Sequence, residues 1–363
     1  MTPAIAWIDN RGMSAPPLHH LIPSRLPLLQ APMAGAQGSP LALAVCAAGG
    51  VGGLPAAMLS PEALQAELQL LRQQARGPWN VNFFCHASPE PDNAAEARWR
   101  QALAPFYDEA GIDPAHIPAG AGRVPFSHAV ADVVEPFAPP VVSFHFGLPA
   151  PDLLARVKGW GSRVLSSATT VEEARWLEAH GVDAIIAQGL EAGGHRGMFL
   201  THELGTQLGT FALLPQVVAA VRVPVIAAGG LASAAGVRAA MDLGASGVQV
   251  GTAFLCCPEA STSALHREAL MSEAARHTEL TTLFSGRPAR GIVNRLMREL
   301  GPLNPAAPAF PLATAAVAPL RAHFEALGRT DCTPLWSGQN ASGCRTVPAA
   351  DLLADLACGF EPL

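Results

Sequence analysis

The chain has 363 residues, of which 50% are apolar and 14% are charged. An apolar fraction of this size can form a large core, which excludes an intrinsically disordered chain. The net charge is −6 and the basic residues form no run, so we expect neither nucleic acid nor a membrane surface as a partner. No stretch reaches the roughly 18 apolar residues that a membrane span needs.

The cysteines carry no sign of a metal site or of a disulfide framework. There are seven, with no C-x-x-C pair and no His/Cys cluster at metal-ligand spacing, so we expect no metal. An odd number in a chain of this length fits reduced thiols, and the N-terminus does not resemble a signal peptide. We therefore expect a cytoplasmic protein. The sequence leaves the oligomeric state open and allows a homodimer.

The first half of the chain predicts strands separated by helices. Residues 1–26 are expected to be an irregular lead-in, because Pro16, Pro17 and Pro23 disfavour regular structure. A buried strand over 27–33 then leads into a Gly-rich turn. Ser60 and Pro61 predict a helix start, with serine as the N-cap and proline at the first helical position.

The second half repeats a strand-then-helix pattern more regularly. Thr170 and Glu173 have the spacing of a capping box, and Gly181 is a typical helix stop. The strands are continuous apolar runs, as expected when helices cover both faces of a parallel sheet.

Counting strands gives the fold class. They are expected near residues 28, 50, 80, 141, 163, 184, 224 and 247. Eight strands favour a closed (β/α)₈ TIM barrel over an open sheet. We assign the barrel to residues 27–259, with a helical insertion at about 92–138. Residues 260–363 would form a C-terminal helical or irregular extension, or a small cap packed on the barrel.

Glycines at the ends of two neighbouring strands suggest a phosphate site. Gly229-Gly230 and Gly251-Thr252 place backbone N–H groups beside helix starts, where an anion is stabilised. Phosphate sites of barrels are common at strands seven and eight. The alternative is that these glycines serve tight turns only.

A Gly-rich loop after the sixth strand carries the best acid–base candidate. It runs from Gln188 to Gly197 and contains Glu191, His195 and Arg196. A histidine flanked by glycines at a strand end can reach a ligand and titrates near neutrality. Asn82 and His145 end the third and fourth strands at the same mouth, although each by itself is compatible with a structural role.

Five segments at or near the predicted strand ends follow one another along the chain. They are Gln30-Ala31-Pro32-Met33, Asn80-Val81-Asn82-Phe83-Phe84, Gly189-Leu190-Glu191-Ala192-Gly193-Gly194-His195, Ala227-Ala228-Gly229-Gly230 and Gln249-Val250-Gly251-Thr252-Ala253-Phe254. In this order they resemble the motifs of the nitronate monooxygenases, formerly called 2-nitropropane dioxygenases. Residues 285–291 and 335–339 are similar to later segments of that family.

The resemblance implies an FMN enzyme on a TIM barrel that oxidises alkyl nitronates with O₂ to a carbonyl compound and nitrite. His195 would be the catalytic residue, with His145 and Arg196 as candidates for substrate binding. The expected FMN contacts are Met33, Asn82, Gln188, Gly193, Gly194, Gly229, Gly230, Gln249, Gly251 and Thr252. Two features depart from the family pattern: the turn at residues 34–40 and the long insertion.

Other functions remain open at this point. An NAD(P)H-dependent quinone or enoyl-thioester reductase would share the flavin barrel, although residues 49–53 match no G-x-G-x-x-G motif. A flavin-free lyase or isomerase acting on a phosphorylated substrate would also explain the Gly-rich cradle. A non-catalytic binding protein is disfavoured, because polar groups converge on one face of the barrel.

Overall fold

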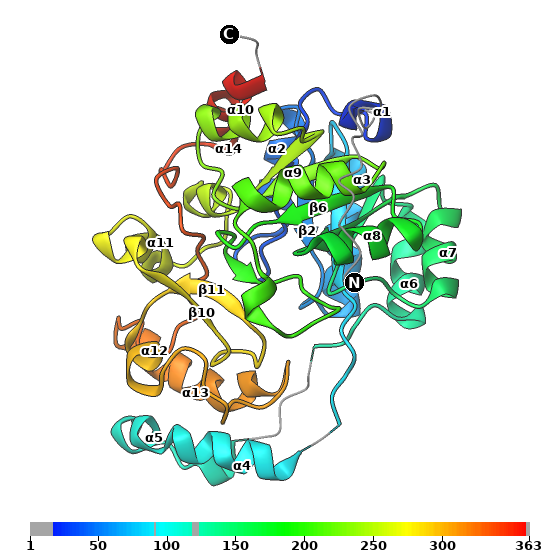
Figure 1. Cartoon of the computed structure of the whole chain (residues 1–363). Helices are drawn as coiled ribbons and strands as arrows, with labels where there is room; N and C mark the ends of the chain where they lie inside the picture. Colours follow the sequence, from blue (N-terminus) through cyan, green and yellow to red (C-terminus); the bar gives the residue numbers. More distant parts are fainter. Residues whose placement is uncertain (1–16, 91, 118–122, 361–363) are drawn as a thin grey trace, which may run out of the picture.

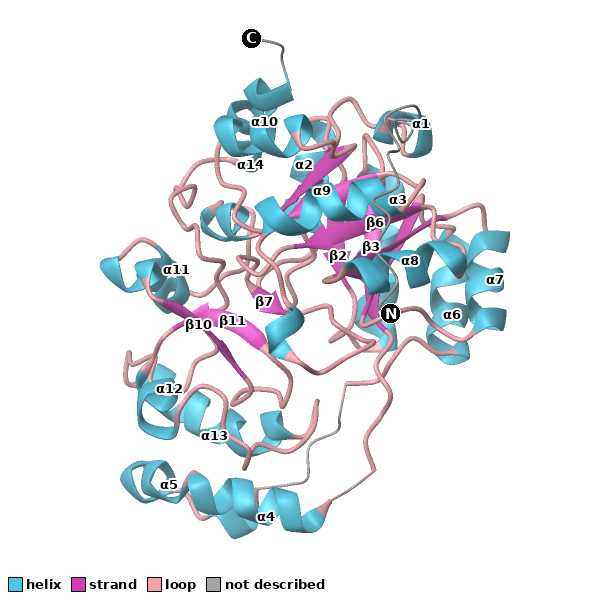
Figure 2. Cartoon of the chain, in the orientation of Figure 1, coloured by secondary structure: helices cyan, strands magenta, loops and turns pink. Residues whose placement is uncertain are grey.

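The computed structural model describes residues 17–90, 92–117 and 123–360. In these ranges eight parallel strands form a barrel in the order β1-β9-β8-β6-β5-β4-β3-β2 (Figure 2). The predicted TIM barrel and its strand positions are confirmed. The strands are β1 (Leu28–Gln30), β2 (Gly52–Pro55), β3 (Trp79–Phe84), β4 (Val141–His145), β5 (Arg163–Ala168), β6 (Ala184–Gln188), β8 (Val225–Ala228) and β9 (Gly247–Val250).

Backbone hydrogen bonds between β1 and Val51 close the barrel. The Gln30 N–H donates to the Val51 carbonyl, and the Val51 N–H donates to the Leu28 carbonyl, both at 2.9 Å. A parallel bridge joins Leu29 to Val51. Closure of this kind leaves no free sheet edge and directs the carboxyl ends of all strands to one mouth.

Helices cover the outside of the barrel. They are α2 (Ser39–Ala47), α3 (Pro61–Gln74), α6 (His128–Val134), α7 (Pro151–Gly159), α8 (Val171–Ala179), α9 (Thr210–Ala220), α10 (Ala234–Asp242) and α14 (Ala349–Ala357). Ser60 Oγ accepts the Ala63 N–H at 3.2 Å, which confirms the predicted helix start. Gly181 follows α8 with φ +87°, which confirms the predicted stop.

The other end of the barrel is closed by the segment before β1. Leu18 and Ile22 are buried there with Leu29 and Val51. Leu18–Leu21 forms the short helix α1, so the prediction of an irregular lead-in is wrong at these residues. Pro17 takes the N-cap position, where a helix does not need its N–H. Residues 1–16, including Pro16, lie outside the described residues.

A second lobe packs over the mouth of the barrel. An antiparallel sheet forms its floor, in the order β10-β11-β7, with helices beyond it (Figure 1). Its elements are β7 (Gly194–His195), β10 (Thr278–Thr281), β11 (Ala289–Ile292), α4 (Asn93–Ala102), α5 (Ala104–Ala110), α11 (Ala264–Leu270), α12 (Arg295–Leu300) and α13 (Ala313–Ala326). The remaining short helices of the chain are the 3₁₀ turns η1 (Pro114–His116), η2 (Glu135–Phe137), η3 (Leu204–Thr206), η4 (Thr252–Cys256), η5 (Glu273–Arg276) and η6 (Cys358–Phe360).

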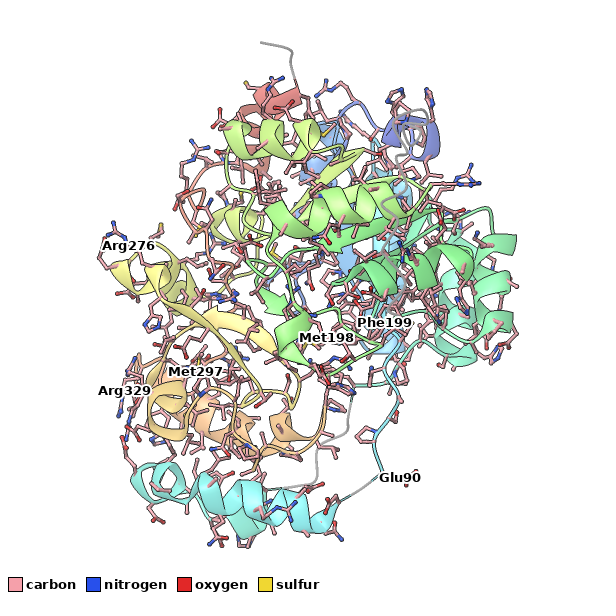
Figure 3. All side chains as sticks on the ribbon, viewed as in Figure 1. Glu90, Met198, Phe199, Arg276, Met297 and Arg329 are labelled. Carbon is pink, nitrogen blue, oxygen red and sulfur yellow. The ribbon has the colours of Figure 1, made fainter. Side chains whose placement is uncertain are left out.

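This lobe has a hydrophobic core of its own, built from two distant parts of the chain. Trp99 and Phe106 of the insertion are buried against Leu320 and Phe324 of α13. Trp99 Nε1 donates to the Ala313 carbonyl at 3.1 Å. Figure 1 shows α4 and α5 lying along α13. Figure 3 labels Met297 and Arg329 in the same lobe.

The chain crosses between the two lobes more than once. After β9 it enters the second lobe and then returns to the barrel, where α14 packs against α2 and α10. Within the insertion, α6 packs on α3 and α7 in the barrel wall. The domain boundaries given above stay predictions.

No helix in the described ranges combines the length and the apolar character needed to cross a membrane.

Candidate active site

A cavity of ≈ 310 Å³ lies at the mouth of the barrel, beneath the second lobe. Cavities of this size and position are typical of ligand sites in barrels. Most of the residues predicted from the sequence line it. These are Met33, Asn82, His145, Gln188, Gly193, Gly194, His195, Gly229, Gly230, Gln249, Gly251 and Thr252.

Glycines at the ends of β8 and β9 form a cradle of unpaired backbone donors. Gly229 and Gly230 have φ of +115° and +74°, conformations that other residues rarely adopt. Within the described part of the chain, the backbone N–H groups of Gly229, Gly230 and Gly251 donate no hydrogen bond. These three glycines are half-buried and line the cavity, so their unpaired N–H groups suit an anionic ligand.

The segment 337–340 returns from the second lobe to complete this cradle. Asn340 Nδ2 donates to the Gly230 carbonyl, and the Gly338 N–H donates to Thr252 Oγ1, both at 2.9 Å. A Cβ on Gly193 would lie 2.5 Å from the Gly338 nitrogen, so these two backbones need glycine to meet. Residues 335–339 resemble a segment of the family in sequence, but we did not predict a role for them in the site.

The turn after Met33, at residues 34–40, departs from the family pattern. Hydrogen bonds of Gln37 attach it to the barrel. Gln37 Nε2 donates to the Gly53 carbonyl, and Gln37 Oε1 accepts from Gln30 Nε2. The Ala36 carbonyl accepts the Ser261 N–H at 2.9 Å. The turn is thus tied to both the barrel and the segment after β9.

His195 lies on β7, where the Gly-rich loop pairs with β11 of the second lobe. Its ring Nε2 is 2.8 Å from Ser285 Oγ. Burial lowers the pKa of His195 well below 6.5, and the nearby charges of Arg123 and Arg287 lower it further. The ring is therefore neutral at pH 7 and can accept a proton.

His145 lies next to His195 but has both ring nitrogens in use. Its Nε2 is 3.1 Å from the His195 carbonyl, which can only accept, so this nitrogen carries the proton. Its Nδ1 is 3.1 Å from Ser167 Oγ. Burial lowers the pKa of His145 to about 4. His145 thus lines the cavity as a neutral support for the backbone of His195.

The amide side chains at the mouth differ in what they contact. Gln188 Nε2 donates to the His195 carbonyl at 3.0 Å, and its Oε1 accepts the Gly197 N–H at 2.8 Å. Asn82 Nδ2 donates to Ser143 Oγ at 3.0 Å. Gln249 Oε1 is buried and has no hydrogen-bond partner among the described residues. The Gln249 oxygen is therefore free to accept from a ligand.

The structure does not bring Arg196 into the cavity. Its side chain is 0% exposed and points behind the loop, where its guanidinium donates to the carbonyls of Gln188 and Gly189 and to Gln207 Oε1. Alternation along β7 and the residue after it places neighbouring side chains on opposite faces. This is why His195 can face the cavity while Arg196 does not.

Glu191, on the same loop, does not pair with Arg196 either. Its carboxylate accepts the N–H and the hydroxyl of Thr210, at 2.7 to 2.9 Å, at the start of α9. A carboxylate at a helix N-terminus is stabilised by the backbone donors there. The Glu191 carboxylate therefore stabilises the conformation of the loop by binding the start of α9.

Two arginines that we did not predict lie near the His195 end of the cavity, which we call the reacting end: Arg123 lines the cavity, whereas Arg287 does not. Arg287 lies over the Phe146 ring at 3.9 Å, and Arg123 over the Phe310 ring at 5.4 Å. No ion pair with a carboxylate is found for either among the described residues. Burial lowers the pKa of Arg287 to about 10, so it stays charged at neutral pH and gives this end a positive potential.

The positions of these arginines explain why the sequence did not point to them. Arg123 belongs to the insertion, which carries no recognisable motif. Arg287 lies in the segment 285–291, which resembles the family but to which we assigned no roles. Folding brings both close enough to His195 to lower its pKa. The His195 ring centroid lies 6.2 Å from that of Phe84 and 5.6 Å from that of Trp336.

Among the described residues there is no group of three or more His, Cys, Asp or Glu side chains that would hold a metal ion.

Comparison with known proteins agrees with this geometry. The family model described as nitronate monooxygenase matches residues 15–359. A nitronate monooxygenase of Paraburkholderia phytofirmans is 42% identical over 337 residues, covering 91% of each chain. The solved structure of a nitroalkane oxidase from Streptomyces ansochromogenes has 38% identity and a TM-score of 0.84, covering 94% of this chain and 98% of that one.

A more distant solved structure shares the fold. FabK from Thermotoga maritima has 26% identity and a TM-score of 0.69, covering 94% of this chain and 95% of its own. The match to the family model and the relatives above extends over nearly the whole chain at higher identity. This protein therefore belongs to the nitronate monooxygenase family and is an oxidoreductase.

Proposed function

We propose that this enzyme binds FMN at the barrel mouth and oxidises alkyl nitronates with O₂ to a carbonyl compound and nitrite. The observation that carries the proposal is a neutral His195 facing a cavity with a positive wall at one end and a cradle of unpaired donors at the other. A nitronate is an anion and a flavin phosphate is another, so the two ends suit the two ligands.

The residues present fit FMN. The unpaired N–H groups of Gly229, Gly230 and Gly251, together with Thr252, would hold the phosphate. Gln249 Oε1, which lacks a partner, would accept from the polar edge of the ring system. Further contacts would come from Met33, Asn82, Gln188, Gly193 and Gly194. Bound FMN would supply the electron acceptor that the protein itself lacks.

The side chains around His195 would bind and orient the substrate. Arg123 and Arg287 attract the anionic nitro end, because no carboxylate pairs with them in the described chain. Ser285 orients the His195 ring at 2.8 Å. The neutral imidazole can donate a hydrogen bond to a nitronate, or accept the carbon-bound proton of a neutral nitroalkane. We assign His145 an indirect role, through the carbonyl of His195.

An NAD(P)H-dependent reductase is the second candidate, because it would use the same flavin barrel. Anaerobic reduction of the flavin by nitronate and by NADH, followed separately by stopped-flow absorbance, separates the two. Rapid reduction by NADH without any response to nitronate would favour the reductase.

The proposal is tested first by the absorption spectrum of the purified protein. We expect flavin bands, release of FMN on denaturation, and nitronate-dependent O₂ consumption with nitrite formation. A colourless protein that does not take up added FMN would contradict the proposal and favour a flavin-free barrel enzyme.

All seven cysteines are free, which is compatible with the proposed cytoplasmic location.

A further inference from the structure

Behind the catalytic loop, buried side chains form a continuous chain of hydrogen bonds. Arg196 Nε donates to Gln207 Oε1 at 3.0 Å, and Gln207 Nε2 donates to Thr169 Oγ1 at 3.0 Å. Thr169 Oγ1 donates in turn to Glu173 Oε2 at 2.7 Å. Gln207 is 7% exposed, and the side chains of the other three are fully buried. We call these four residues the relay.

The two ends of the relay hold the two ends of the loop. Arg196 donates to the Gln188 carbonyl at 2.7 Å and to the Gly189 carbonyl at 2.6 Å, where the loop leaves β6. Glu173 Oε1 accepts the N–H of Phe199 at 2.5 Å and that of Leu200 at 3.2 Å. Figure 3 labels Met198 and Phe199 at this second end. His195 lies between these two points.

The chemistry of the relay gives it one direction. A guanidinium only donates and a carboxylate only accepts, so the groups between them must each accept on one side and donate on the other. Gln207 and Thr169 are side chains that do both. The relay thus links a buried cation to a buried anion that are not in direct contact, and leaves none of these groups unpaired.

Glu173 also shows that the relay departs from ordinary helix capping. Thr170 Oγ1 accepts the Glu173 N–H at 3.1 Å, as a capping box requires. The Glu173 carboxylate does not return to Thr170 but accepts from the N–H and hydroxyl of Thr169, both at 2.7 Å. Glu173, which the sequence predicts as part of a helix cap, therefore binds the end of the loop instead.

We propose that Glu173, Thr169, Gln207 and Arg196 are positioning residues that hold His195 against the reacting end of the cavity. The proposal rests on the proposed function only for the identity of the reacting residue. If the relay is broken, the loop between Gln188 and Leu200 gains freedom, and water reaches the His195 ring. The imidazole then spends less time in the geometry that proton transfer needs, so turnover falls while substrate and FMN still bind.

Thr169→Val is the sharpest test, because it removes the hydroxyl and keeps the shape of the side chain. We expect kcat to fall about 10-fold with KM within about twofold, since misplacement of a catalytic group affects chemistry more than binding. Thr169→Ser restores the hydroxyl and should restore kcat. Gln216→Leu is the matched control, because Gln216 bonds to Ala212 within α9.

Two further readouts separate positioning from general destabilisation. Hydrogen exchange of peptides covering 189–200 should be about 10-fold faster in Thr169→Val, whereas peptides from α3 should not change. The acidic limb of the pH profile of kcat/KM should move up, because water raises the His195 pKa towards 6.5. The groups facing His195, namely Arg123, His145, Arg287 and His86, are unchanged in the variant.

Gln207→Leu breaks the relay at a second link. If Thr169→Val does not fold, the same measurements are made on Gln207→Leu. The proposal is overturned if the folded variants show wild-type hydrogen-exchange rates in residues 189–200 and keep wild-type kcat. It is also overturned if Thr169→Ser fails to restore activity. A wild-type protein without nitronate turnover would refute the proposed function instead, and the exchange experiment would still test the relay.

Discussion

His195 and His145 lie side by side, and the contacts of their ring nitrogens separate their roles. Both nitrogens of His145 are used, on Ser167 and on the carbonyl of His195. The ring of His195 contacts Ser285 through Nε2 alone. A side chain with a nitrogen left over can take part in proton transfer, whereas one with none can only support its neighbours.

At this scale we predict that His195→Asn binds FMN but loses about 100-fold or more in turnover, the low end of an acid–base contribution. Asparagine keeps a polar group of similar size but cannot accept the proton from the carbon of the substrate. Steady-state O₂ consumption with nitronate and with nitroalkane measures the effect. Near-normal turnover of both substrates in this variant, with His145→Asn inactive, would transfer the role to His145.

Among the elements, the carboxyl ends of β8 and β9 determine whether the phosphate can bind. We predict that Gly230→Val folds but is purified without FMN. The φ of +74° at Gly230 costs a non-glycine residue about 1–2 kcal/mol. A Cβ there would lie 3.4 Å from Glu191 Cβ, so the larger valine side chain would press on the loop beside the cradle. The flavin-to-protein absorbance ratio measures occupancy.

Gly328→Val is the matched control for this substitution. Gly328 has a similar φ of +71°, and no atom lies within 4 Å of an added Cβ. It follows α13, in the second lobe. The control should show the same backbone strain but keep its flavin, and full occupancy in Gly230→Val would refute the phosphate site.

The helices of the insertion depend on the second lobe for their stability. We predict that Trp99→Ala lowers the free energy of unfolding by about 3–5 kcal/mol, as expected for a buried aromatic side chain. The substitution also removes the hydrogen bond to the Ala313 carbonyl. Urea denaturation followed by circular dichroism measures the loss. Trp160→Ala, at a half-buried tryptophan on the outside of the barrel, should cost less, and equal losses would contradict the packing described.

For the whole molecule, buried neutral histidines make stability depend on pH. Burial lowers the pKa of His145 and His266 to about 4, whereas the unfolded chain titrates near 6.5. Between these values the unfolded state binds more protons, so stability is complete above about pH 6.5 and falls as the pH drops towards 4. Each histidine contributes up to about 3 kcal/mol of this loss.

We therefore predict that the thermal midpoint falls between pH 6.5 and 4.5, and that His266→Gln shows a shallower fall. Glutamine can still donate to the Trp336 carbonyl, which His266 Nε2 contacts at 3.0 Å, but it does not titrate. Thermal denaturation across this pH range tests the prediction. Parallel curves for the two proteins would contradict it.

The sequence by itself determined the barrel and the position of its mouth. Continuous apolar strands, helix caps and glycines are local signals, and the parallel arrangement sends all strand ends to one side. Residues at those ends, such as Gln188, His195 and Gly230, are therefore predicted near a common cavity by their positions in the chain, and the three do line it.

Only the tertiary structure decided what surrounds that cavity. Arg123 and Gly338 reach it from segments far away in the chain, and no local pattern encodes such long-range contacts. Arg196 shows the reverse case, because its neighbour faces the cavity while its own side chain is turned into a buried hydrogen-bond chain. A charged group out of water needs partners on all its donors, and only the fold shows where those partners lie.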